Sequence, residues 1–257
     1  MKNYTHTHLL GCPGHGNNVI RQLLYNQKTT KVDGTTTDVQ VLELYKRSKT
    51  DNGGEFFCFT AEECTLSDFN TLMASLHPEA RHSLDVPNAG GSSGLSEALS
   101  MQYMHRRHGA RSFVAEMEVP YWIEYKICDY LMLVDEKELY VGVSVTRAVP
   151  YPFGTLYTIE RARELLKRKL YGLIVAQECV REDYGFHECI LHVWCATREA
   201  ADRINQAHME IAASGTEESA TYDKVHVICT VCPHKYLYTN RPEHASDQIS
   251  SLITTKQ

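Results

Sequence analysis

The chain has 257 residues, of which 43% are hydrophobic and 23% charged. These proportions are typical of one folded domain with or without an extension, and no apolar run approaches the ~20 residues that a membrane-spanning helix needs. The formal net charge of −6 provides no overall attraction to nucleic acid. A nucleic-acid-binding function therefore requires a local basic face.

The cysteines indicate a reducing compartment. They are odd in number, scattered, and mostly embedded in apolar runs, a pattern typical of buried thiols rather than of a disulfide framework. The opening residues 1–8 are polar and have neither the apolar stretch of a signal peptide nor the Arg-rich pattern of a transit peptide. We expect a cytoplasmic or nuclear protein with no membrane partner.

The first ninety residues predict a small α+β extension. A turn at 51–54 separates two strand-like runs and indicates a hairpin with a long loop. The stretch 81–93 is rich in Gly, Pro, Asn and Ser and predicts a linker or mobile loop. The elements expected before it are helices over 18–25 and 70–76 and strands over 39–45 and 55–60.

After this loop the pattern predicts an α/β domain. Ser96 is a candidate N-cap for a helix that ends before Gly109, and Thr158 is a candidate cap for a long helix whose apolar residues follow helical spacing. The expected helices are 97–108, one from 159 onward, and 198–213. The expected strands are 113–119, 125–134, 139–149, 188–195 and 224–231. The expected organisation is an extension over 1–90, a core over 94–235 and a polar tail over 240–257.

The element order of the core resembles that of the PD-(D/E)xK, or restriction-endonuclease-like, nuclease superfamily. That core has a helix, a three-strand meander, a helix and a strand, here followed by a further helix and strand. The resemblance implies a metal-dependent nuclease site, in which Glu97 matches the acid of the first helix and Asp129, in Ile-Cys-Asp-Tyr-Leu, matches the acid of the second strand. Carboxylates there hold Mg²⁺, which activates water and stabilises the phosphate.

The third strand departs from the superfamily pattern. Ser144 and Thr146 stand where Glu-x-Lys is expected, and Arg147 follows them. A hydroxyl thus replaces the metal carboxylate, and a second hydroxyl replaces the lysine. The segments 141–150, 165–175 and 190–195 also resemble an uncharacterised eukaryotic family, to which we attach no biochemical role.

Three interpretations follow. In the first, the chain is a degenerate nuclease-like protein that binds nucleic acid, with RNA favoured over DNA, or acts within a ribonucleoprotein or other protein complex, and it needs no cofactor. In the second, it is an active Mg²⁺-dependent nuclease in which Glu116 or Glu118 joins Glu97 and Asp129 as a metal ligand. In the third, the likeness is coincidental and Asp129 faces solvent on an ordinary α/β domain. A rival function from another class is a non-catalytic protein–protein interaction subunit, in which the aromatic residues near the site serve as interface anchors.

Basic residues on two helices suggest a phosphate-binding surface. The long helix carries Arg161 and Arg168 on one side, with Lys167 nearby, and the first core helix ends in Arg106 and Arg107. Arg147 follows the candidate site. The opposing interpretation is a solvated helix face, because Glu160 and Glu164 partly neutralise the long helix.

Two further motifs carry weaker signals. Cys229 and Cys232 with His234 have the spacing of half a zinc site, but no second CxxC is present. The glycine-rich run 11–16 lacks the Gly-Lys-Ser/Thr ending of a phosphate loop and predicts a turn. A Cys–His nucleophilic pair among Cys12, His6, His8 and His15 is chemically conceivable, although no third group to orient it is evident.

Overall fold

The computed structural model describes residues 39–50, 56–86, 93–134, 139–150, 155–216, 222 and 224–238. Its strands are β1 (Val39–Thr50), β2 (Phe56–Leu66), β3 (Ser112–Ala115), β4 (Tyr130–Leu133), β5 (Tyr140–Ala148), β6 (Phe186–Cys195) and β7 (Val225–Val231). Its α-helices are α2 (Phe69–Ala74), α3 (Pro78–Asp85), α4 (Gly94–His108), α5 (Ile159–Cys179) and α6 (Arg198–Ala213). Short 3₁₀ turns are η1 (Glu116–Glu118), η2 (Glu182–Tyr184) and η3 (Lys235–Tyr238).

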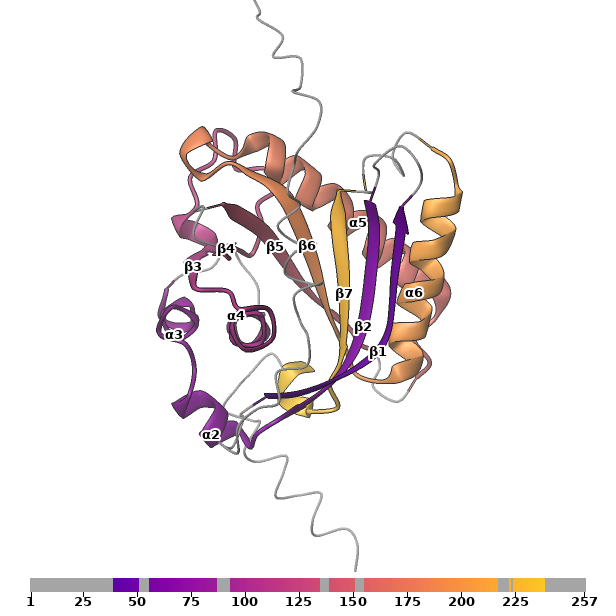
Figure 1. The fold of residues 1–257 in the computed structure, drawn as a ribbon, viewed down its shortest axis with the longest axis horizontal. Helices are drawn as coiled ribbons and strands as arrows, with labels where there is room; N and C mark the ends of the chain where they lie inside the picture. The colour runs from indigo at the N-terminus through magenta and orange to yellow at the C-terminus, as the bar shows by residue number, and fades with distance from the viewer. Residues whose placement is uncertain are drawn as a thin grey trace, which may run out of the picture.

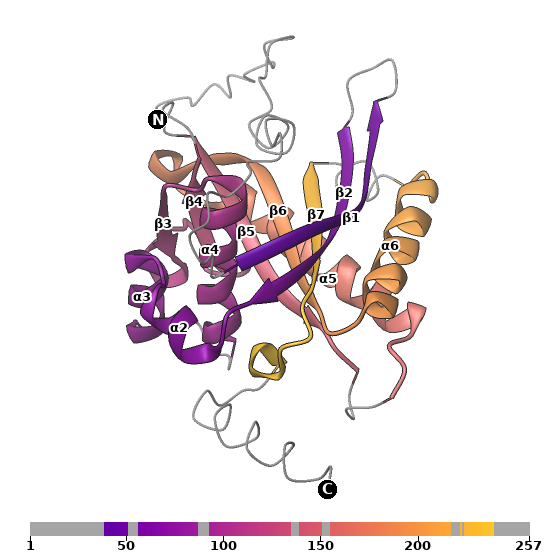
Figure 2. The same ribbon diagram turned by 60° about the horizontal axis from the view of Figure 1, so that its bottom comes forward.

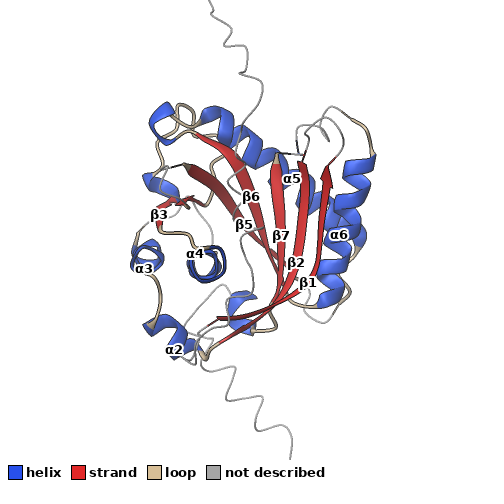
Figure 3. Ribbon diagram, viewed as in Figure 1, coloured by secondary structure: helices blue, strands red, loops and turns tan. Residues whose placement is uncertain are grey.

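The described strands form one mixed sheet in the order β1-β2-β7-β6-β5-β4-β3 (Figures 1 and 3). β3, β4 and β5 form an antiparallel meander, and β5, β6 and β7 run parallel to one another. β2 pairs parallel to β7, and β1 closes that edge as an antiparallel partner of β2. The two strands expected in the N-terminal extension therefore belong to the same sheet as the core.

Helices cover both faces of this sheet. α4, together with α2 and α3, lies on one face, whereas α5 and α6 lie on the other (Figures 1 and 2). Alternate side chains of each central strand enter one of two separate cores, as the pleat requires. Trp194 packs toward α4, whereas Leu191 and Val193 pack toward α5 and α6. This two-sided burial explains the nearly continuous apolar sequence of β6 and β7.

The helix ends follow from local chemistry. The Thr158 side chain accepts a hydrogen bond from the Arg161 N–H at 3.4 Å, and the Thr197 side chain accepts one from Ala200 N–H at 3.2 Å. α4 ends at Gly109, whose φ of 69° lies in the left-handed region that glycine adopts without a steric cost. The predicted helix over 198–213 and the predicted cap at Thr158 are confirmed.

Several predicted elements differ from the structure. The stretch predicted as a linker from residue 81 is helical as far as Asp85, because α3 begins at Pro78, a residue suited to a first helical turn. The strand predicted over 113–119 ends at Ala115, and the 3₁₀ turn η1 follows it. The strand predicted over 125–134 is confined to β4, since the residues before Tyr130 form bends.

The remaining predictions fall on other parts of the chain. The helix over 18–25, the turn over 11–16 with its Cys and His residues, the turn over 51–54 and the tail over 240–257 lie outside the described residues. Among the described helices, none combines the length and the apolar character needed to cross a membrane.

Candidate functional site at Asp129, Ser144 and Lys169

Asp129 is bound to β5 by its backbone and by its side chain. It directly precedes β4, and its N–H donates to the carbonyl of Val143 at 2.9 Å. Its Oδ2 accepts a hydrogen bond from the Ser144 hydroxyl at 2.6 Å and one from the Val145 N–H at 2.5 Å. The structure therefore brings Asp129 and Ser144 together, although they are fifteen positions apart in the chain.

Lys169 supplies a cation to this pair from α5. Its Nζ donates to the Ser144 Oγ at 3.0 Å and lies 3.6 Å from the Asp129 Oδ2. The side chains of Lys169 and Asp129 are 26% and 14% exposed, so the pair is shielded from water more than a surface ion pair is. Ser144 thus donates to a carboxylate and accepts from an ammonium, which uses its single donor and one of its two acceptor lone pairs.

Lys169 was not among the residues predicted for the site, although the sequence carries a usable signal for it. Leu166, Leu170 and Leu173 are buried and form the inward-facing stripe of α5. Lys169 is next to Leu170 in the chain, so helical spacing places it beside this stripe. A lysine at such a position needs a polar partner beneath it.

Glu97 approaches the cluster from the opposite helix. It lies in the first turn of α4, is 8% exposed, and accepts a hydrogen bond from the Ser93 hydroxyl at 2.5 Å. Burial, and then the negative charge of Asp129, raise the pKa of Glu97 to about 7. Glu116 adds to this effect, whereas Lys169 opposes it. Glu97 and Asp129 therefore interact electrostatically, although Glu97 is not among the donors and acceptors bonded to Asp129.

The other predicted site residues occupy different positions. Thr146 is half-buried on the same side of β5 as Ser144, two residues farther along the strand. Arg147 is half-buried; burial lowers the pKa of its guanidinium, and the Glu97 carboxylate opposes that change. Glu118 does not join the cluster. Its Oε1 lies 2.9 Å from the His82 Nε2, and its Oε2 accepts from the Ala115 N–H at 3.1 Å.

This arrangement does not fit a magnesium site. Among the described residues, no group of three or more His, Cys, Asp or Glu side chains is placed to hold a metal ion. The Asp129 Oδ2 already receives two hydrogen bonds, and the Lys169 ammonium occupies the neighbouring position. A hard cation prefers unshared carboxylate oxygens, and it is repelled by a positive charge at this distance.

The predicted zinc half-site is also divided. Cys229 faces the α5–α6 core, whereas Cys232 lies in the other core, and both are free, buried thiols. His234 stacks on Tyr236. Side chains three positions apart on a strand point to opposite faces of the sheet. Because β7 is buried on both faces, Cys229 and Cys232 therefore enter different cores.

The basic residues fall into separate groups rather than on one surface. Arg106 and Arg107 end α4 on one face of the sheet, whereas Arg161, Lys167 and Arg168 lie on α5 on the other (Figure 2). Arg107 is not available to phosphate in this arrangement, because its Nη2 lies 2.8 Å from the Oε1 of Glu62, a side chain only 1% exposed.

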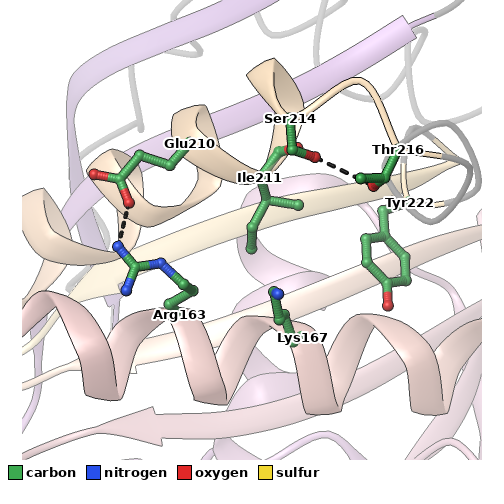
Figure 4. Close-up of a pocket in the computed structure, with 7 residues that line it drawn as sticks. All are labelled: Arg163, Lys167, Glu210, Ile211, Ser214, Thr216 and Tyr222. Carbon is green, nitrogen blue, oxygen red and sulfur yellow. Dashed lines mark hydrogen bonds and ion pairs between the residues drawn. The ribbon is translucent and has the colours of Figure 1, made fainter.

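The cations of α5 lie on two different sides of the helix. Arg161 and Arg168 are exposed on one side. Burial raises the pKa of the nearby Tyr157 phenol, and the charges of these two arginines partly oppose that rise. Lys167 lies about a third of a turn away and lines a pocket of about 240 Å³ between α5 and α6 (Figure 4). In that pocket, Arg163 reaches across to Glu210 at 2.5 Å and is neutralised by it.

A buried polar network beneath α4 also went unpredicted. The Ser100 hydroxyl lies 2.8 Å from the Tyr130 hydroxyl and 2.7 Å from the His192 Nδ1, and the His192 Nε2 lies 2.9 Å from the Thr230 hydroxyl. Burial lowers the pKa of His192 to about 3, so the ring is neutral at physiological pH. The network is bonded at every one of these atoms, which fits a structural role.

Comparisons with known proteins identify a relative that covers part of the chain. The chain is 32% identical over 184 residues to the AAC-rich mRNA clone AAC4 protein of Dictyostelium discoideum, an alignment that covers 65% of this chain and 26% of that protein. The chain thus spans about a quarter of the relative's length. No family model matches the chain, and no solved structure matches it.

Proposed function

We propose that this chain is a non-catalytic domain with a restriction-endonuclease-like core that binds nucleic acid, with RNA favoured over DNA. The order α4, β3–β4–β5 meander, α5, β6 supports the fold assignment, since it repeats the element order of that superfamily. In this proposal, Glu97 in α4, Asp129 before β4 and Ser144 in β5 correspond to the site positions of the superfamily.

The contact of Lys169 with Ser144 and Asp129 carries the non-catalytic part of the proposal. In a metal-dependent nuclease, clustered carboxylates supply both charge and geometry to the ion. Here the Asp129 charge is instead balanced by an ammonium 3.6 Å away, and a serine hydroxyl takes the position of the second carboxylate. The site is then a hydrogen-bonded cluster that links β4, β5 and α5.

The exposed side of α5 supports the binding part. Arg161 and Arg168 lie two turns apart on one side of the helix, and both are exposed. Phosphate contacts by such residues position nucleic acid without reading its sequence. A net charge of −6 then makes binding depend on this local face and on low salt.

Titration of the purified chain with fluorescent single- and double-stranded RNA and DNA over a series of salt concentrations tests the binding. We expect binding that weakens steeply with salt. Substitution of Arg161 and Arg168 by Ala should lower the salt slope by about one unit for each phosphate that the side chains no longer reach. Arg163→Ala is the matched control, because Arg163 is already paired with Glu210. Absent binding, or an unchanged slope in the double variant, contradicts the proposal.

An active nuclease with rearranged ligands is the second candidate. The ammonium of Lys169 beside Asp129 is the one feature that this cluster shares with such a site, whereas a set of metal ligands is not assembled among the described residues. A lysine that orients water is expected in such a site, and α5 supplies an ammonium where β5 supplies none. Incubation of the same nucleic acids with Mg²⁺ or Mn²⁺ decides between the two. The non-catalytic proposal predicts intact substrates, whereas robust cleavage that is lost in Asp129→Ala establishes the second candidate.

A further inference from the structure

The segment that precedes Asp129 exposes three large apolar side chains within a stretch of four residues, 122–125. Trp122 is 69% exposed, and Ile123 and Tyr125 are each 64% exposed. We call these residues and the neighbouring Arg181 the Trp122 surface. Single exposed apolar residues are common on soluble domains, but three within four residues, with a tryptophan and a tyrosine among them, are typical of a binding site.

The backbone holds this surface in place. The Trp122 N–H donates to the Cys179 carbonyl at 2.8 Å, and the Arg181 N–H donates to the Pro120 carbonyl at 3.0 Å. Between them, Tyr121 pairs with Val180 as an isolated antiparallel bridge, and its hydroxyl accepts the Cys128 N–H at 3.1 Å. Tyr121 packs into the core beside α5. The segment is therefore fixed on its inner side while its neighbours point outward, which lowers the entropic cost of binding.

Each aromatic ring has a cation on one face. The Arg181 guanidinium lies 5.3 Å from the Trp122 ring centroid, and the Lys126 ammonium lies 5.2 Å from the Tyr125 centroid. Cation–π contacts of this kind hold an exposed ring in one orientation. The rings remain more than half exposed despite these contacts, so a large apolar area is still available to a partner.

The two chain segments that carry the surface contain more carboxylates than cations. The two segments that the bridge joins, 116–126 and 178–183, carry six carboxylates against two cations. Glu124 and Glu182 are exposed. The exposed Asp183 lies 3.9 Å from the Arg181 guanidinium, and Glu118 pairs with His82. Glu124 and Glu182 are therefore the carboxylates most available to a partner. These segments account for most of the net charge of the chain, which is −6. Such a rim repels a phosphate backbone and attracts a basic polypeptide.

We propose that the Trp122 surface binds a basic protein segment that places apolar anchor residues on Trp122, Ile123 and Tyr125. Apolar burial supplies the affinity, and the acidic rim selects lysine- and arginine-rich sequences and steers their approach. This surface is distinct from the exposed side of α5 that bears Arg161 and Arg168. Its occupant is a protein, and its binding does not depend on the nucleic-acid function.

Tryptophan fluorescence provides a direct measurement. The chain has two tryptophans; Trp194 is fully buried, whereas Trp122 is exposed. Acrylamide quenching therefore reports chiefly on Trp122. The probe is a synthetic peptide in which Lys and Arg alternate with Leu and Phe, so that the peptide itself contains no tryptophan or tyrosine. We expect the peptide to protect Trp122 from quenching and to shift its emission to the blue, and a matched peptide with Glu in place of each cation to do neither.

Variants then localise the binding. Ile123→Ala with Tyr125→Ala keeps the Trp122 reporter and should weaken the peptide Kd at least about tenfold, the effect of losing one binding hot spot. Glu182→Lys with Asp183→Lys should weaken it at low salt and less at high salt. Tyr171→Ala, which removes an exposed aromatic from α5, is the control and should leave binding unchanged.

Four results overturn the proposal. They are equal binding of the acidic peptide, an unchanged Kd in both double variants, protection of Trp122 by oligo(U) in place of the basic peptide, and protection of Trp122 through self-association in sedimentation experiments. Far-ultraviolet circular dichroism and thermal melting of each variant confirm that the exposed substitutions leave the fold intact.

Discussion

Lys169 on α5 donates a hydrogen bond to the Ser144 hydroxyl on β5 at 3.0 Å. Through this contact, a helix on one face of the sheet places its charge 3.6 Å from the Asp129 carboxylate at the start of β4. The link balances the charge of a half-buried carboxylate with a cation. The contribution of this contact can be measured as a change in the free energy of unfolding.

Lys169→Met should destabilise the fold by roughly 2 kcal/mol, because it removes the cation that balances a poorly exposed carboxylate. In a double-mutant cycle with Asp129→Asn, the two changes should be non-additive by about 1 kcal/mol or more. Urea unfolding gives both quantities. Lys167→Met, at the exposed neighbouring position, is the control. Equal effects of the two lysine substitutions, or strict additivity in the cycle, show that the contact contributes nothing to stability.

Glu97 should make stability depend on pH. Its pKa is raised from 4.5 in the reference state to about 7 in the folded protein, mainly by burial. Between these values the folded state binds more protons than the unfolded state, so this contribution is fully present below about pH 4.5 and is lost as pH rises through about 7. Glu97→Gln abolishes this loss.

Urea unfolding of wild type and Glu97→Gln at about pH 5 and about pH 8 measures the effect. The stability of the variant relative to wild type should increase by up to roughly 3 kcal/mol across that window. Other titrating groups cancel in the comparison, since they are common to both proteins. A relative stability that is flat or falls with rising pH contradicts the electrostatic description of Glu97.

Substitution of the two adjacent arginines at the end of α4 should have very different effects on the stability of the fold. Arg107 pairs with the buried Glu62, which also accepts a hydrogen bond from Tyr103. Burial alone would raise the pKa of Glu62, but His108, Arg107 and Tyr103 together hold it below its ordinary value. Arg107→Ala leaves that carboxylate buried without its cation and should cost about 3–5 kcal/mol.

Arg106→Ala is the matched control for that change, because Arg106 is exposed. It should cost under about 1 kcal/mol, as is usual for surface substitutions. Chemical denaturation of both variants is the measurement. Similar losses for the two variants are the outcome that contradicts a structural role specific to Arg107.

Two glycine-to-alanine substitutions should have opposite signs. A Cβ at Gly142 in β5 would overlap the ring of Phe186, a residue only 2% exposed, so Gly142→Ala should destabilise by about 1–3 kcal/mol. Gly172 lies within α5 and has open space at its Cβ position. Gly172→Ala should therefore stabilise by about 0.5–1 kcal/mol. Thermal melts that shift in the same direction for both variants contradict this interpretation of the packing.

Local sequence patterns determined most of the individual elements. The Thr158 cap and the leucine spacing define α5, and the apolar run of β6 with the following Thr197 cap defines the boundary to α6. These features were predictable because capping and amphipathic periodicity depend on residues only a few positions apart. The expectation that Asp129 and Ser144 share one site comes from the resemblance to the nuclease superfamily, and the structure joins these two residues by a hydrogen bond.

Only the tertiary structure decided how these elements meet. The pairing of β2 with β7 joins residues more than 160 positions apart, and local sequence does not encode which strand edge a hairpin will occupy. The separation of α4 from α5 divides the arginines between two faces, and the turn η1 directs Glu118 to His82. The role of Lys169 depends on which residue of the sheet its side chain reaches from α5. That reach is fixed by the packing of α5 against β5, a relationship that arises only when both elements bury their apolar sides in one core.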